Sequence, residues 1–427
     1  MLDFEALETA ARRKALAVSA RVLERHLNAD HSDRQASSVP CPSCSAPVSY
    51  QGRRQKPFQT VLGELKLERA YYYCAACKGG FYPRDHALGM GKTSLSPAVT
   101  RMIGTVGAMV SFAEGSQLLS ELAGVEINPK HVERGAESLG EEVAAWEQSF
   151  VEPPAAGESL APTLYLGMDG TGAPMRPSEL LDRAGKQPDG SAKTREVKLV
   201  TVWSAEGRDA EGVAVRDPGS VTYSAAIESA ACRDDDEQPS EFAQRISREA
   251  TRQGFDGVAC QVVLGDGAPW IWKLTEEFFP RALQIVDRFH VKQRLADVAK
   301  AIFGPTHPKA KSWTEKRHAQ LDLGKLDGIL AALEPHLASV PEARRCRDYL
   351  EKNRHRMRYP DFHAQGLCTS SGVVEAACRV VVGQRLKRSG MRWTVRGANA
   401  IAALRCNRLS GRFEDFWERR AARAHAA

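Results

Sequence analysis

The chain has 427 residues, which is enough for two to four domains with at least one large hydrophobic core. Its 59 Lys and Arg against 53 Asp and Glu give a net charge of +6, which fits a polyanionic partner without requiring one. No run approaches the roughly 18 apolar residues of a membrane span, and residues 1–12 carry too many charges for a secretory signal. We therefore expect a cytoplasmic protein with no membrane partner and with reduced cysteines.

Two N-terminal segments have helical patterns. Residues 1–39 are predicted to form one helix, because Leu16, Ala20, Leu23 and Leu27 recur at helical spacing. Residues 91–150 are predicted to form a helical domain, with a wholly helical pattern over residues 95–150. A turn that contains Asn128 as a cap and Pro129 at the first helical position gives this segment a helix-turn-helix-like, DNA-binding pattern. Two packed core helices without DNA contact are the alternative. Residues 151–160 are predicted to be a linker.

Residues 40–90 contain two C-x-x-C pairs, one near each end of the segment. The four cysteines are Cys41, Cys44, Cys74 and Cys77. Two strand-like runs, Pro47–Gln51 and Leu65–Tyr73, lie between the pairs. This pattern is typical of a zinc ribbon, in which four thiolates hold a structural Zn²⁺. Redox pairs are the alternative, but no thioredoxin-like βαβ pattern surrounds them. The six other cysteines are interpreted as buried thiols: Cys232, Cys260, Cys346, Cys368, Cys378 and Cys406.

The pattern changes to strands and helices over residues 161–290. The order is β-β-β-α-β-α-β, which indicates a layered α/β domain with a three-stranded meander. The predicted elements are strands Thr163–Met168, Glu196–Ser204 and Val221–Ile227, helix Ser240–Gln253, strand Val258–Leu264, helix Ala268–Phe279 and strand Ala282–Val286. Residues 291–366 are predicted to be an all-helical insertion. Residues 367–427 contain one or two helices over Gly372–Arg408 and a basic tail.

Acidic residues follow two of the predicted strands. Asp169 follows the first strand and Asp266 follows the fourth, each next to glycine, which lets a metal or ligand approach the backbone. Glu375 would lie in the first turn of a helix capped by Ser370 or Ser371. Three carboxylates suit two Mg²⁺ ions for phosphoryl displacement. The alternative for each single Asp is a cap or turn residue. The run Asp234-Asp235-Asp236-Glu237 is interpreted as a solvated loop.

Several sequence blocks resemble those of DDE insertion-sequence transposases, specifically the Kra-type group. The matching blocks are Met168-Asp169-Gly170-Thr171-Gly172, Leu264-Gly265-Asp266-Gly267-Ala268-Pro269-Trp270-Ile271-Trp272, Asp287-Arg288-Phe289-His290, Ser371-Gly372-Val373-Val374-Glu375 and Gly383-Gln384-Arg385-Leu386-Lys387-Arg388-Ser389-Gly390-Met391-Arg392-Trp393. They occur in the same order as in that family and span roughly residues 163–417.

The resemblance implies a fold and an activity. The fold would be an α/β ribonuclease-H-like core, a mixed five-stranded sheet with helices, plus an all-α insertion, an N-terminal zinc ribbon and a helical DNA-binding domain. The long interval between Asp266 and Glu375 fits family members with such an insertion. The protein would bind terminal inverted repeats, cut at the element ends and join the 3′-hydroxyls to target DNA. Asp169, Asp266 and Glu375 would bind two Mg²⁺ or Mn²⁺. The synaptic complex implies a homodimer or higher oligomer, associated with the nucleoid.

The same resemblance assigns roles to further residues. Asp287 and His290 resemble a C/D-x-x-H element and would support the site or position DNA rather than bind the metal. The alternative is a structural His290 whose ring is satisfied by a local hydrogen bond. The predicted DNA contacts are Trp270, Trp272, Arg385, Lys387, Arg388, Arg392, Trp393 and Arg396. Core packing is the alternative for at least one of Trp270 and Trp272. Two other functions stay open: a ribonuclease-H-like nuclease or resolvase that only hydrolyses, and a domesticated DNA-binding regulator.

Overall fold

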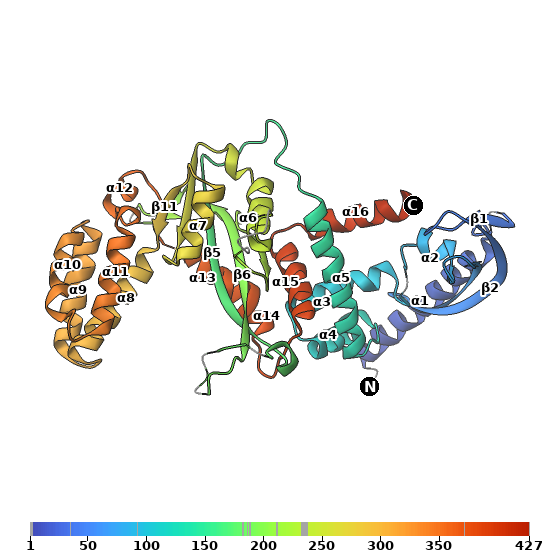
Figure 1. The fold of residues 1–427 in the computed structure, drawn as a ribbon. Coiled ribbons are helices and arrows are strands. Elements are labelled where there is room, and N and C mark those ends of the chain that lie inside the picture. The colour runs from blue at the N-terminus through green and yellow to red at the C-terminus, as the bar shows by residue number, and fades with distance from the viewer. Residues whose placement is uncertain are drawn as a thin grey trace. The chain divides into compact units, whose positions relative to one another are not determined.

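The computed structural model describes residues 3–34, 36–91, 93–181, 183–185, 187, 189–210, 212–231, 238–370 and 372–426 (Figure 1). Cys232, Ser371 and the acidic run Asp234-Asp235-Asp236-Glu237 lie outside these residues. The chain divides into two compact units. Unit 1 comprises Met1–Val143 with Arg412–Ala427, and unit 2 comprises Ala144–Gly411. Among the described residues, no helix is both long and apolar enough to cross a membrane.

Unit 1 combines a four-stranded antiparallel sheet with helices. Its elements are α1 (Phe4–Ala29), β1 (Ser38–Pro40), β2 (Pro47–Thr60), β3 (Gly63–Cys74), β4 (Gly79–Phe81), α2 (Pro83–Ala87), α3 (Pro97–Met109), α4 (Phe112–Leu118), a π-helical turn (Leu119–Ala123), most of α5 (Pro129–Ser149) and α16 (Phe413–Ala426). The strands follow the order β1-β2-β3-β4. A tight turn at Gly63 joins the two long strands of the β2–β3 hairpin. This turn requires glycine because residues with a side chain rarely adopt its φ of +116°.

The hairpin is longer than the sequence pattern predicts. The expected strand over Pro47–Gln51 continues to Thr60, because β2 pairs with β3 all the way to the Gly63 turn. The helical pattern predicted from residue 95 agrees with the structure to within two residues at its start, since the first helix, α3, begins at Pro97. The predicted cap at Asn128 is confirmed, because its Oδ1 accepts from the backbone N–H of His131 at 2.9 Å.

Unit 1 also includes the C-terminal helix α16, although the sequence groups this segment with the second half of the chain. The physical reason is its contacts with α3 and α5. Phe413 lies over Gly104, where an added Cβ would sit 3.4 Å from the ring, and Arg101 pairs with Glu414. Arg420 pairs with Glu142 at 2.9 Å.

Unit 2 is built on a mixed five-stranded sheet. Its first elements are β5 (Thr163–Pro174), a 3-10 turn (Pro177–Glu179), β6 (Thr194–Ser204), β7 (Gly207–Arg208), β8 (Ala214–Val215), β9 (Thr222–Ala226), α6 (Glu241–Arg252), a 3-10 turn (Phe255–Gly257), β10 (Cys260–Gly265), α7 (Pro269–Phe278) and β11 (Leu283–Val286). The five-stranded order is β11-β10-β5-β6-β9. β5, β6 and β9 form an antiparallel meander, whereas β10 is parallel to both β5 and β11. The predicted β-β-β-α-β-α-β series is therefore confirmed.

A helical insertion follows β11 and a broken helical segment follows the insertion. The insertion contains α8 (Arg288–Phe303), α9 (Pro308–Asp322), α10 (Leu326–Leu333), a 3-10 turn (Glu334–His336), α11 (Pro341–Lys352), a 3-10 turn (Arg354–Arg356) and α12 (Tyr359–Ala364). The last elements of unit 2 are α13 (Gly372–Ala377), a π-helical segment (Cys378–Gly383), α14 (Gln384–Leu386) and α15 (Val395–Leu409). The helical prediction for the insertion is confirmed. The last segment is more broken than predicted, because Trp393 pairs with the end of β5 between α14 and α15.

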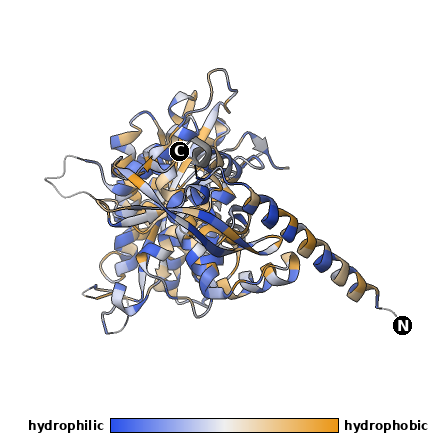
Figure 2. Ribbon diagram, turned by 90° about the vertical axis from the view of Figure 1, so that its right-hand side faces the viewer, coloured by the Kyte–Doolittle hydropathy of each residue, from blue (hydrophilic) through white to orange (hydrophobic). Residues whose placement is uncertain are grey.

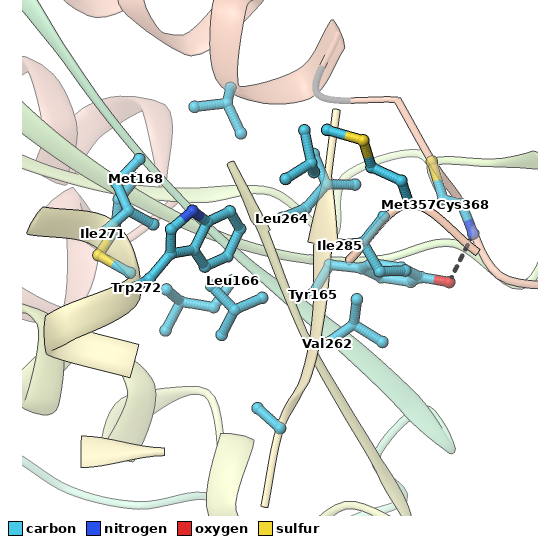
Figure 3. Close-up of a cluster of buried hydrophobic side chains, with 14 of the residues drawn as sticks. Tyr165, Leu166, Met168, Val262, Leu264, Ile271, Trp272, Ile285, Met357 and Cys368 are labelled. Carbon is cyan, nitrogen blue, oxygen red and sulfur yellow. Dashed lines mark hydrogen bonds between the residues drawn. The ribbon is translucent and has the colours of Figure 1, made fainter. Parts of the chain in front are cut away.

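The core of unit 2 lies around the central strands and continues into the insertion (Figure 3). Tyr165 of β5 is 1% exposed and stacks on Trp203 at 5.5 Å. Its hydroxyl accepts from the backbone N–H of Cys368 at 3.0 Å, a bond drawn in Figure 3. This bond attaches the segment after the insertion to the central strand. As a result, the chain that leads to Glu375 has a fixed starting point on the sheet.

Candidate functional site

The four predicted zinc cysteines come together in unit 1. Their sulfur atoms all lie within 4.8 Å of one another, and among the described residues this is the one group of three or more ligand atoms that meets this limit. Cys41 Sγ lies 3.9 Å from Cys77 Sγ, and Cys44 Sγ lies 3.7 Å from Cys74 Sγ. These separations are far longer than a disulfide bond, so the four thiols are free.

The sulfur spacing fits a tetrahedral metal. Four ligands at the usual Zn–S length of about 2.3 Å have S···S separations of roughly 3.8 Å. The two measured separations, 3.7 and 3.9 Å, lie on either side of that value. Backbone N–H groups of Ser43 and Cys44 lower the pKa of the Cys41 thiol to about 7, which favours the thiolate that a metal needs. The cluster can therefore hold a structural metal such as zinc.

The second candidate site begins at Asp169 in unit 2. The structure corrects one detail: Asp169 lies inside β5, which continues to Pro174, and does not follow the strand. Its Oδ1 accepts from its neighbour Gly170 N at 2.6 Å, and its Oδ2 accepts from the Cys378 thiol at 3.3 Å. Burial and the nearby charge of Asp266 raise the pKa of Asp169, while His290 lowers it.

Asp266 directly follows β10, beside Asp169. The parallel register pairs Leu264 with Gly167, so two steps further along the strands Asp266 comes level with Asp169. Its Oδ1 accepts from Ala268 N at 2.9 Å. Its backbone carbonyl accepts from the Tyr349 hydroxyl of α11 at 2.8 Å. The predicted position of this acid at a strand end is therefore confirmed.

Asp287 and His290 form a connected pair at the end of the next parallel strand. Asp287 is 1% exposed and caps α8, where its Oδ1 accepts from Phe289 N at 2.7 Å. Its Oδ2 lies 2.7 Å from His290 Nδ1. This bond raises the pKa of His290, as do the charges of Asp287, Asp266 and Asp169, although burial opposes them. Both Asp287 oxygens thus form hydrogen bonds within the protein, which suits a supporting role rather than metal binding. The Asp287 bond uses His290 Nδ1, so Nε2 takes no part in it.

Glu375 lies on α13. The preceding residue of the same helix, Val374, packs over Gly167 of β5. Cys378, which contacts Asp169, follows three positions later at the start of the π-helical segment. The backbone that bears Glu375 therefore passes close to Asp169, while the Glu375 side chain is exposed. The three acids do not all bring oxygens within 4.8 Å of one another, since within the described part of the chain the cysteine cluster alone meets that limit.

Burial separates the predicted DNA-contacting residues into two groups. Arg385, Trp272 and Trp393 are 0%, 3% and 6% exposed, which contradicts a role in contacting DNA at the surface. Arg385 lies over the Trp393 ring at 5.2 Å, and Arg356 lies over Trp272 at 4.6 Å, so these aromatic rings pack inside the unit. The core alternative for Trp272 is therefore confirmed.

The other predicted DNA contacts remain accessible. Lys387, Arg392 and Arg396 are exposed, and Arg388 and Trp270 are half-buried. The Lys387 ammonium donates to Thr171 Oγ1, two residues beyond Asp169 on β5. Trp270 lies under the ammonium of Lys198 at 4.4 Å. A positive charge thus lies close to the carboxylate site.

Three residues around the site have no sequence signal. Cys378 touches Asp169 across 209 residues of chain, and Tyr349 touches Asp266 across 83. A third residue, Tyr359, donates to the carbonyl of Val286 at 2.9 Å, directly before Asp287. Each contact depends on long-range packing, so periodicity and motif spacing cannot reveal it.

A family model for an uncharacterised protein family, UPF0236, matches residues 182–420, which is more than half of the chain. The chain belongs to the UPF0236 family. No curated protein matches the chain. The UPF0236 match contains Asp266, Asp287, His290 and Glu375, but it begins after Asp169. The four-cysteine cluster also lies outside it, so the UPF0236 region corresponds mainly to the sheet after β5, the insertion and the segment that carries Glu375.

Proposed function

We propose that this UPF0236 protein is a metal-dependent DNA transposase of the DDE class, with Asp169, Asp266 and Glu375 as its carboxylates. One observation carries the proposal. Asp169 and Asp266 lie level on neighbouring parallel strands, and the helix that bears Glu375 is held beside Asp169 by Cys378. These acids are far apart in sequence, and they are carried by β5, by the residue after β10 and by a helix that packs on β5. The mixed five-stranded sheet supports a ribonuclease-H-like core.

The donor set fits magnesium by its chemistry. Mg²⁺ prefers hard oxygen ligands, commonly one or two carboxylates with substrate phosphates, and Asp169 and Asp266 would hold it, with Glu375 completing the set. When bound, the metal would stabilise the attacking and leaving oxygens of phosphoryl transfer. The backbone N–H groups of Gly170 and Ala268 each hold one carboxylate oxygen in place.

Residues around the acids have matching roles. Asp287 fixes the His290 ring through Nδ1, so that Nε2 can donate to a phosphate, and the hydrogen bond to Asp287 raises the pKa of His290, which favours the charged ring. Lys387, beside Thr171, supplies a cation near the edge where DNA would pass. Exposed Arg392 and Arg396 would add phosphate contacts. Zinc at the four-cysteine cluster would be structural, and unit 1 would bind the terminal repeats.

A cleavage and strand-transfer assay tests the proposal. Linear DNA with the ends of the element would be incubated with the full chain and Mg²⁺ or Mn²⁺. Asp266→Asn should abolish both nicking and joining, because it removes the negative charge that binds metal. Asp256→Asn is the matched control, since Asp256 is exposed and absent from the site. Cutting that survives Asp266→Asn would refute the assigned site.

Two other outcomes would change the function. Metal-dependent cutting without joined products, with the same loss in Asp266→Asn, would indicate a nuclease that only hydrolyses. Specific binding of the ends without cutting in either metal would indicate a domesticated DNA-binding regulator.

A further inference from the structure

Helix α1 has two apolar faces, although the protein covers only one. Toward its C-terminal end, Ala20 and Leu27 pack on the β2–β3 hairpin with Phe58, Leu65 and Leu67. A second set of apolar residues is exposed. We call this set the outer stripe, and it consists of Phe4, Leu7, Ala11, Ala15, Val18 and Val22. In Figure 2 hydrophobic and hydrophilic segments alternate along this helix, up to the end marked N.

The outer stripe is one continuous line along the helix. Successive members are three or four residues apart, which keeps them on one face over about 27 Å at 1.5 Å per residue. Its large members are well exposed: Phe4 72%, Leu7 48%, Val18 60% and Val22 64%. The inward residue Ala20 lies roughly 160° around the helix from Val22, two residues further on, at 100° per residue. The hairpin therefore cannot cover the stripe.

Single exposed apolar residues are normal on protein surfaces, but an aligned row of this length indicates an interaction surface. A solvent-facing helix side is usually polar, and α1 has no need of a second apolar face to pack on its own unit. The arrangement within the stripe shows what covers it. Bulky residues lie at both ends, whereas Ala11 and Ala15 at the centre let another backbone approach closely.

The stripe is complementary to itself in the antiparallel direction. Phe4 and Val22 are separated by about five helical turns, so they have the same angular position. Asp3 and Arg21 have the same separation and flank the stripe on one side. A second copy running antiparallel therefore places its Val22 against Phe4 and its Arg21 near Asp3. Arg25 lies one turn beyond Arg21 on the same side and adds to this attraction.

A parallel arrangement lacks this match. It would place the acidic ends, with Asp3, Glu5 and Glu8, beside each other. Near the centre, Arg12 points off the stripe and donates to the carbonyl of Leu122 at 2.8 Å. Exposed Lys14 flanks the stripe on the same side as Asp3 and Arg21, so the antiparallel pair brings two Lys14 side chains together, a repulsion that the Asp3–Arg21 pairs at both ends oppose. We propose that two copies of this chain associate through an antiparallel pair of α1 helices along the outer stripe.

The proposal is tested on the full chain, without DNA, by analytical ultracentrifugation. Wild type should form a dimer. Leu7→Glu and Val18→Lys should each weaken it by more than about tenfold, because each removes a buried apolar side chain and adds a charge. Both residues are exposed within one chain, so the fold and the metal content should not change. Leu323→Glu is the matched control, since Leu323 is a 63% exposed leucine in the helical insertion.

Combining the two substitutions tests the direction of pairing. In the antiparallel pair, position 7 of one chain faces position 18 of the other. A mixture of Leu7→Glu and Val18→Lys chains should therefore form dimers more tightly than either chain alone. A chain that carries both substitutions separates the two directions: an antiparallel pair then has two Glu–Lys contacts and dimerises more tightly than either single variant, whereas a parallel pair has Glu–Glu and Lys–Lys contacts and dimerises less tightly. A monomeric wild type at high micromolar concentration, an unaffected dimer in Leu7→Glu, or vesicle binding by a monomer through α1 would each overturn the proposal. None of these results depends on DNA cleavage, so failure here leaves the proposed activity untouched.

Discussion

Gly267, which directly follows Asp266, should tolerate no side chain. Its φ is +91°, and a Cβ placed there would lie 2.5 Å from Tyr349 Cε2 and 2.7 Å from its hydroxyl. The backbone strain of Gly267→Ala costs about 1–3 kcal/mol. The ring must also move, which loses the 2.8 Å hydrogen bond to the Asp266 carbonyl, worth about 1 kcal/mol. We therefore expect Gly267→Ala to lower the free energy of unfolding by about 2–4 kcal/mol.

A control separates backbone strain from the contact with Tyr349. Gly304 has φ +94° and nothing within 4 Å of an added Cβ, so Gly304→Ala should show strain alone. Urea unfolding followed by tryptophan fluorescence gives both free energies. In the double variant Gly267→Ala/Tyr349→Ala the ring is absent, so its effect should be smaller than the sum of the two single effects by about 1–2 kcal/mol. Additivity to within about 0.5 kcal/mol would refute the contact.

Two further predictions concern the metal cluster and the histidine. Cys74→Ser, or removal of metal by a chelator, should release about one zinc per chain and unfold the β2–β3 region of unit 1. Hydrogen exchange should show this loss of protection in unit 1, while the sheet of unit 2 stays protected. Full protection of both units without zinc would contradict a structural role for the metal. His290→Gln should destabilise the protein more at about pH 5.5 than at about pH 8.5. The sign follows from the raised pKa of His290: its stabilisation is complete below the unfolded value of 6.5 and is lost as pH rises through the folded value. A difference in unfolding free energy that does not change with pH would show that the bond to Asp287 does not depend on the charge of the ring.

Local sequence patterns predict the sheet well because its strands differ in burial. β10 is almost wholly apolar since it lies between two parallel neighbours, whereas β6 alternates apolar residues with Lys198 and Thr201, although it is buried from Val197 to Ser204. The predicted end of β5 is wrong because Gly170-Thr-Gly172 has the composition of a turn. In the structure these glycines keep the strand going, since side chains of β6 occupy the space that a Cβ would need. A Cβ at Gly170 would meet the Glu196 carboxylate, and one at Gly172 would lie 2.7 Å from the Thr194 hydroxyl.

The sequence identifies candidate acids for the site, but it does not identify the residues that hold them in place. Asp266 directly follows a strand that is easily recognised, so its position can be derived from the sequence. Whether Glu375 reaches the same edge depends on Val374 packing over Gly167 and on the thiol of Cys378, and both are set by tertiary contacts. Arg385 is predicted to contact DNA at the surface, and this prediction is wrong. Its basic block indicates a surface, but the side chain lies over the Trp393 ring inside unit 2.

The helical insertion takes part in the site through main-chain carbonyls. Asp266 and Val286 lie where β10 and β11 end, so their carbonyls have no further strand pairing. Tyr349 of α11 donates to the first carbonyl at 2.8 Å, and Tyr359 of α12 donates to the second at 2.9 Å. A buried carbonyl without a donor would destabilise these strand ends, so the insertion stabilises the backbone directly at Asp266 and directly before Asp287. A shift of the insertion would therefore move the backbone beside both acids without contact with either carboxylate.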